Sequence, residues 1–291
     1  MNAAYDFLVA PFVEFGFMQR ALAGALMLSL GSCPVGVFLM LRRMSLAGDA
    51  MAHAILPGAA VGFLLYGLEI VPMTIGGLLA GLAVALAAGA VSRFTLQRED
   101  ASMAAFYLIS LAAGVLIVSM RGSSVDLMHV LFGTVLALDD AALTLIATIA
   151  GVTLLSLAIF WRALVAECLD PLFLRSVSRL GAPVHFVFLG LVVLNLVGGF
   201  QALGTLLAVG LMMLPAAAAR FWTSRIETMS LLAVAIGMVS SVAGLLASYH
   251  ASLPSGPAII FAAGAIYLFS LAFGWRGVVA SRLRPHRHRT A

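Results

Sequence analysis

The chain has 291 residues, of which 63% are hydrophobic and 10% charged, and its formal net charge is +4. Soluble domains carry about 25% charged residues, so this composition excludes an ordinary soluble protein and predicts a polytopic integral membrane protein. All 16 basic residues are arginine, and without a lysine the chain can form neither a phosphate-binding P-loop nor a Schiff base. If the protein uses ATP, another chain must bind it.

Nine apolar stretches approach the roughly 20 residues that a helix needs to cross a bilayer. They lie at about 18–41, 50–68, 72–92, 103–120, 141–161, 184–199, 202–219, 229–248 and 257–275. Arginines collect on the cytoplasmic side of membranes, and their positions here predict an external N-terminus and a cytoplasmic C-terminus. Only Arg20 and Arg121 fall on the wrong side. We expect an all-α helical bundle of about nine spans, forming one transmembrane domain over residues 1–291.

Two features leave the number of spans open between eight and ten. The stretches at 184–199 and 202–219 are short, and residues 123–140 are apolar only in the middle. We interpret 123–140 as a re-entrant or tilted helix near the outer face.

Small residues and prolines recur within the predicted spans. "GAAVG" (58–62) and "GLLAG" (77–81) both have the G-x-x-x-G spacing, which lets membrane helices approach closely. Pro34, Pro57 and Pro215 fall inside spans and predict kinked or broken helices. Transporters use such breaks near binding sites, although kinks are also common elsewhere in membrane helices.

The segment "RRMSLAGDAMAHAILPG" (42–58) carries an acid and an imidazole into an apolar span. Asp49 and His53 are four residues apart and so share one face of a helix. A carboxylate with a neutral imidazole suits zinc or manganese, and ionisable groups inside a membrane usually face a pathway or a partner. The alternative is that Asp49 caps a helix starting near Ala50 while His53 donates to a neighbouring carbonyl. Spacing alone does not separate the two interpretations.

The remaining histidines and the two cysteines give weaker indications. His250 lies in an expected outer loop, His129 in the doubtful 123–140 helix, and His286 and His288 in a basic tail at about 276–291. We expect the tail to lie beside anionic lipid headgroups. Cys33 and Cys168 are too few and too far apart to predict a disulfide framework or a thiolate zinc site.

The largest polar interruption spans about 162–182. Apolar residues at helical spacing alternate there with Arg175 and Arg179, and Asp170 followed by Pro171 is a typical helix start. The pattern predicts an amphipathic helix that lies on the membrane surface or docks onto a cytoplasmic partner. A plain connecting loop is the alternative.

Four segments in order resemble the zinc/manganese-type permeases of bacterial ABC importers, the ABC-3 family. They are "RRMSLAGDAMAHAILPG" (42–58), "ECLDPLFLRSVSRLGAP" (167–183), "QALGTLLAVGLMMLPAAAAR" (201–220) and "LPSGPAIIFAAGAIYLFSL" (253–271). The resemblance runs from about residue 15 to 275. It implies a type II importer-like permease in the bacterial inner membrane, which forms a homodimer and works with a cytoplasmic ATPase and an extracytoplasmic metal-binding protein.

The resemblance also implies roles for particular residues. Asp49 and His53 match the metal-binding aspartate and histidine of the family. Residues 167–181 match its coupling helix, which would contact the ATPase through Glu167, Asp170, Pro171, Phe173, Arg175, Arg179 and Gly181. No resident cofactor and no nucleic acid is implied. The cargo would be a divalent cation; the imidazoles mildly favour zinc, and manganese or ferrous iron stay open.

Three other functions are alternatives to this one. A proton-coupled secondary transporter would use Asp49 and His53 as a relay and would need no ATPase. An intramembrane metalloenzyme would need a motif like H-E-x-x-H, and the chain has no H-E dipeptide. An importer of a bulky metal chelate would not need the Asp/His pair.

Overall fold

The computed structural model describes residues 3–67, 69–120, 138–169, 174 and 181–279, and the regular structure of these residues is entirely helical. In order the helices are α1 (Ala3–Leu8), α2 (Ala10–Glu14), α3 (Gly16–Leu41), α4 (Ser45–Tyr66), α5 (Ile70–Phe94), α6 (Glu99–Met120), α8 (Asp140–Leu169), α10 (Gly181–Leu203), α11 (Thr205–Arg220), α12 (Ile226–Ala251) and α13 (Ser255–Phe273). A helix satisfies its backbone hydrogen bonds internally, as lipid requires.

The long helices α3 to α13 correspond one by one to the nine apolar stretches of the sequence, which confirms the predicted all-α membrane fold. Eight helices in the described residues are long and apolar enough to cross a membrane. The ninth, α11, has only 16 residues. The predicted helix at 123–140 lies mostly outside the described residues.

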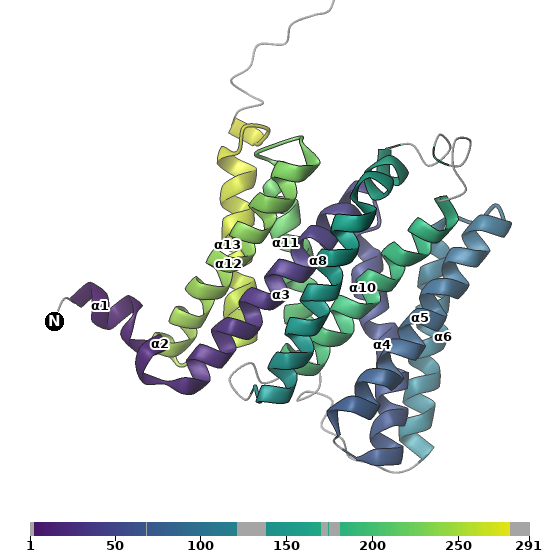
Figure 1. Cartoon of the computed structure of the whole chain (residues 1–291), viewed down its shortest axis with the longest axis horizontal. Coiled ribbons are helices and arrows are strands. Elements are labelled where there is room, and N and C mark those ends of the chain that lie inside the picture. The colour runs from purple at the N-terminus through teal and green to yellow at the C-terminus, as the bar shows by residue number, and fades with distance from the viewer. Residues whose placement is uncertain (1–2, 68, 121–137, 170–173, 175–180, 280–291) are drawn as a thin grey trace, which may run out of the picture.

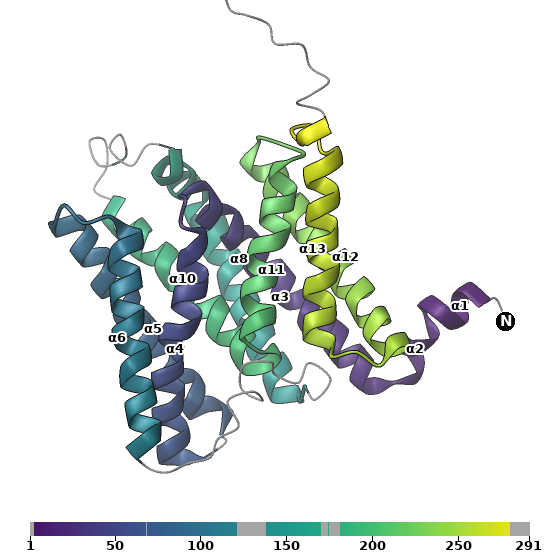
Figure 2. The same cartoon turned by 180° about the vertical axis from the view of Figure 1, so that it is seen from behind.

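Two helices form the centre of the bundle. In their most apolar 18-residue windows, 72% of the residues of α3 and α10 are buried, compared with 17% in α5 and α6. Helix α3 runs obliquely through the middle, with α11, α12 and α13 on one side and α4, α5 and α6 on the other (Figures 1 and 2). Helices α8 and α10 lie between these two groups. The outward surfaces of α5 and α6 are therefore available to lipid or to another chain.

Small residues let α4 and α5 touch backbone to backbone. A Cβ added at Gly58 would collide with the Gly76 carbonyl, and one at Gly62 would lie 2.6 Å from the Pro72 carbonyl oxygen. The close packing predicted from the glycines at 58 and 62 is thus confirmed. Pro34, Pro57 and Pro215 lie inside α3, α4 and α11. No helix is interrupted at its proline, so of the predicted kinked or broken helices the broken form is excluded at these three positions.

Ion pairs and hydrogen bonds connect the helix ends at each side of the bundle. Arg20 Nε at the start of α3 lies 3.4 Å from Asp140 Oδ1 at the start of α8. At the other ends of these helices, Arg42 pairs with Glu167. The exposed Arg20, which breaks the arginine pattern of the sequence, therefore has a carboxylate beside it.

Candidate cation site

Helix α4, which carries the candidate ligands, begins immediately after a tight turn. The Met44 N–H donates to the Leu39 carbonyl and the Arg43 N–H to the Met40 carbonyl, which is the hydrogen-bond pattern of a Schellman motif at the end of α3. Arg43 adopts the left-handed conformation with φ of +60°. The hydrogen bonds of the turn therefore fix the position of the start of α4 relative to the end of α3.

The turn also excludes one of the two interpretations of Asp49, the helix cap. Helix α4 begins at Ser45, so Asp49 lies in the second turn and cannot cap the helix. Its side chain is 68% exposed. The capping alternative placed the helix start near Ala50. It is wrong, because α4 already includes residues 45–48, which precede Asp49.

Asp49 and His53 lie together on one face of α4. Asp49 Oδ1 is 3.9 Å from His53 Nε2, and the His53 side chain is 33% exposed. His53 Nδ1 is buried and has no hydrogen-bond partner among the described residues. The imidazole therefore does not donate to a neighbouring carbonyl from Nδ1, and its other nitrogen is turned toward the carboxylate.

Helix α6 packs beside this pair. The Tyr107 ring centroid lies 6.4 Å from that of His53, and the Ser110 hydroxyl donates to the Ala54 carbonyl at 3.1 Å. Since proline has no N–H, Pro57 cannot donate the helical hydrogen bond to the His53 carbonyl. Tyr107 was not singled out from the sequence, because only the packing of α6 on α4 brings it near His53.

One copy of the described chain supplies only part of a metal site. No group of three or more His, Cys, Asp or Glu side chains able to hold a metal occurs within the described ranges. Protein-bound zinc takes four ligands, and manganese commonly takes six. Farther along α4, Leu56 and Ala60 follow Asp49 and His53 at helical spacing and are partly exposed as well. The pair thus belongs to a stripe that the chain itself leaves partly open.

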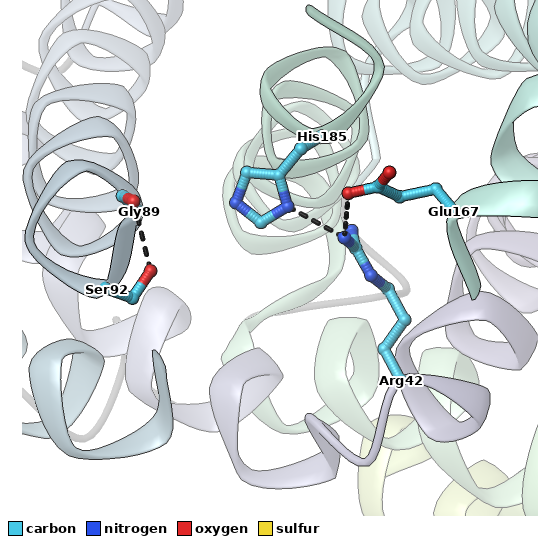
Figure 3. A network of polar contacts seen from close by, with 5 residues as sticks. All are labelled: Arg42, Gly89, Ser92, Glu167 and His185. Atoms are coloured by element: carbon cyan, nitrogen blue, oxygen red, sulfur yellow. Dashed lines mark hydrogen bonds and ion pairs between the residues drawn. The ribbon is translucent and has the colours of Figure 1, made fainter. Parts of the chain in front are cut away.

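A second polar cluster lies near the start of α4 (Figure 3). Arg42 Nη2 is 3.4 Å from Glu167 Oε1 and 2.8 Å from His185 Nδ1. The guanidinium carbon lies 4.8 Å from the centroid of the Phe188 ring, within cation–π range. Glu167 and His185 are almost completely buried, and the Arg42 side chain is 10% exposed. We call Arg42, Glu167 and His185 the buried triad.

The structure locates only two of the residues expected to contact an ATPase. Glu167 belongs to the buried triad and faces the interior. Gly181 is the first residue of α10 and is buried. Outside the described residues lie Asp170, Pro171, Phe173, Arg175 and Arg179.

The other histidines singled out from the sequence do not join the Asp49–His53 pair. His250 stacks on Phe7, with ring centroids 4.1 Å apart, and its Nε2 lies 3.1 Å from the Phe7 carbonyl oxygen. His129, His286 and His288 lie outside the described residues. His185 was missed, although an imidazole within a predicted span is itself a signal of function.

A bundle of apolar helices with an ionisable pair on a partly open face defines a polytopic membrane permease. The chain belongs to the ABC 3 transport family, whose profile matches residues 14–274.

Named relatives cover nearly the whole chain. The manganese transport system membrane protein MntC of Halalkalibacterium halodurans is 33% identical over 262 residues, covering 90% of this chain and 88% of the relative. A protein of Haemophilus influenzae that is named an iron transport system membrane protein is 29% identical over 269 residues, covering 92% and 97%. The structure of PsaBC from Streptococcus pneumoniae in complex with Fab matches with a TM-score of 0.80 and 30% identity, covering 92% of this chain and 96% of that one.

Proposed function

We propose that this chain is the permease of an ATP-driven importer for a divalent transition-metal cation, with manganese as the favoured cargo. The observation that carries the proposal is the Asp49–His53 pair, a carboxylate and an imidazole on a partly open face of a membrane helix. The names of the relatives support manganese first and iron second. The mild preference for zinc drawn from the imidazoles finds no support in those names.

The missing ligands come, in this proposal, from a second copy of the chain. Symmetric pairing would bring two Asp49 carboxylates and two His53 imidazoles together across a twofold axis. The imidazole nitrogens of this set suit zinc and iron, and the carboxylate oxygens suit manganese, which would need further oxygen ligands such as water to complete its octahedral shell. The partly exposed stripe on α4 is the surface through which the two copies would approach each other.

ATP hydrolysis belongs to a separate cytoplasmic subunit, because the chain has no lysine for a P-loop. An extracytoplasmic binding protein would deliver the cation to the outer side. The chain would then expose Asp49 and His53 first to that side and then to the cytoplasm, by alternating access.

Uptake of radioactive manganese tests this function, in cells that lack their own manganese importers and produce the chain with its ATPase and binding protein. We expect Asp49→Asn and His53→Ala each to lower uptake by at least about tenfold, because each removes a metal ligand. His250→Ala is the matched control and should transport normally, since His250 contacts Phe7 at a distance from the pair.

Two results would count against the proposal. Uptake that continues after ATP depletion would support a secondary transporter instead. Normal uptake by both ligand variants would remove the assigned site. Competition by unlabelled zinc or iron that is stronger than competition by manganese would change the assigned cargo and leave the mechanism standing.

A further inference from the structure

The buried triad lies where the end of α3, the end of α8 and the start of α10 meet. The end of α8 and the start of α10 flank the connection between these two helices. Arg42 follows the last residue of α3, Glu167 is in the last turn of α8, and His185 is near the start of α10. Glu167 and His185 therefore stand on either side of the chain between α8 and α10. Arg42 stands just before α4, the helix that carries Asp49 and His53.

The chemistry of the triad makes Arg42 its centre. A guanidinium can only donate hydrogen bonds, so His185 Nδ1 is the acceptor of the 2.8 Å contact. A single nitrogen, Nη2, thus serves both the Glu167 carboxylate and the His185 imidazole. Arg42 Nη1 is buried and has no hydrogen-bond partner among the described residues. Arg42 therefore has donor capacity that the described residues do not use.

Movement of Arg42 would be passed to α4 through the backbone. The Schellman turn fixes Arg42, Arg43 and Met44 by hydrogen bonds to the last turn of α3. Met44, Ala47 and Met51 then anchor the first two turns of α4 in the hydrophobic core. Asp49 and His53 lie on this same stretch of helix, so a rotation at its start reorients them.

Stability alone does not account for a buried ion pair at this position. Apolar residues of similar volume are commonly as stabilising as a buried pair, or more so. A polar contact differs from apolar packing because it can change partners during a conformational cycle.

We propose that Arg42, Glu167 and His185 are positioning residues for transport, which couple movement of the end of α8 and the start of α10 to the orientation of Asp49 and His53. This inference rests on the proposed function. It assigns no direct metal contact to the triad.

The test uses the permease reconstituted with its ATPase and binding protein, with manganese transport and ATP hydrolysis measured together. In Arg42→Met/Glu167→Leu the polar link is replaced by apolar side chains of similar size. We expect this variant to fold and to keep its KM for manganese within about twofold. The number of ions moved per ATP should fall at least about tenfold, because ATP hydrolysis then continues without reorienting Asp49 and His53.

Two comparisons separate positioning from a structural role. Arg98→Met/Asp100→Leu removes an exposed ion pair of the α5–α6 region and should leave the ratio of ions to ATP unchanged. His185→Asn retains an acceptor near the position of Nδ1 and should keep most of the coupling, whereas His185→Phe should lose it.

Normal coupling in folded Arg42→Met/Glu167→Leu would overturn the inference and make the triad structural. If that double variant does not fold, equal coupling in His185→Asn and His185→Phe would overturn it instead. A wild-type complex that moves no manganese on ATP hydrolysis would be a different failure, because it refutes the proposed function and this inference with it.

Discussion

At the scale of single residues, conformation and burial separate the two polar clusters. Asp49 is largely exposed and lies inside a helix that begins four residues earlier, so its carboxylate is accessible from outside the chain. Arg42 is almost buried and held by two partners. The proposed role as a transient metal ligand requires the exposed position of Asp49, and the buried Arg42 has no such position.

Arg43 provides a test of the turn that precedes α4. A residue other than glycine in the left-handed region costs roughly 1–2 kcal/mol, and Arg43 occupies it with φ of +60°. We expect Arg43→Gly to stabilise the detergent-solubilised protein by about 1 kcal/mol, measured as a rise in the midpoint of thermal unfolding. Arg43→Ala keeps the strain and should show no such rise. A lower midpoint in Arg43→Gly would show that the arginine side chain stabilises the turn.

At the scale of elements, α4 is placed by the helices that pack closely on it. Gly58 lies against the backbone of α5, and a Cβ at Gly114 of α6 would lie 2.9 Å from Pro57 Cγ. These contacts leave no room for larger side chains on the covered sides of α4. The partly open stripe with Asp49 and His53 is the side of α4 that these neighbouring helices do not cover.

The contact between α4 and α5 predicts a specific sensitivity. Gly58→Val should destabilise the folded chain by about 1–3 kcal/mol, because the added side chain must displace backbone. The fraction that stays monodisperse on size-exclusion chromatography after heating measures the loss. Gly151→Val on α8 is the matched control, since a Cβ there meets nothing within 4 Å. Equal behaviour of the two variants would mean that the helices separate at little cost.

At the scale of the whole molecule, the helices alternate in direction and bring the arginine-rich ends to one side. The Arg276 N–H at the end of α13 donates to the Phe221 carbonyl in the loop between α11 and α12. Arg42 and Glu167 meet at the ends of α3 and α8. By the positive-inside rule we expect this side to face the cytoplasm.

The topology can be checked with reporter fusions. Green fluorescent protein fused after Ala291 should fluoresce, because it folds in the cytoplasm, and alkaline phosphatase at the same position should be inactive. Alkaline phosphatase inserted after Gly67, between α4 and α5, should be active, since that connection is predicted to lie outside. The reverse pattern would invert the orientation and turn the proposed importer around.

The sequence predicted the long helices well, because apolar length is a strong signal. It placed helix ends less well where polar residues continue a helix. The stretch predicted at 141–161 ends before Arg162, whereas α8 continues to Leu169. Helix α4 begins at Ser45 rather than near Ala50 for the same reason.

The sequence predicted only those site contacts that are made between residues close together along the chain. Asp49 and His53 are separated by one helical turn, so their proximity follows from the sequence. Arg42, Glu167 and His185 come from three distant segments, and only the tertiary packing of α3, α8 and α10 unites them. Tyr107 reaches His53 in the same way, through α6.

The short helix α11 has a consequence for how the protein meets its membrane. Its 16 residues rise about 24 Å, less than the roughly 30 Å hydrocarbon thickness of a bilayer. Much of α11 is buried, and it packs against α3, α10, α12 and α13. The bilayer therefore need not become thinner to match its length. Helices α5 and α6, with 25 and 22 residues, face outward and reach about 37 and 33 Å. Hydrophobic mismatch therefore acts on α5 and α6, and changes in acyl-chain length should tilt these two helices while α11 stays in place.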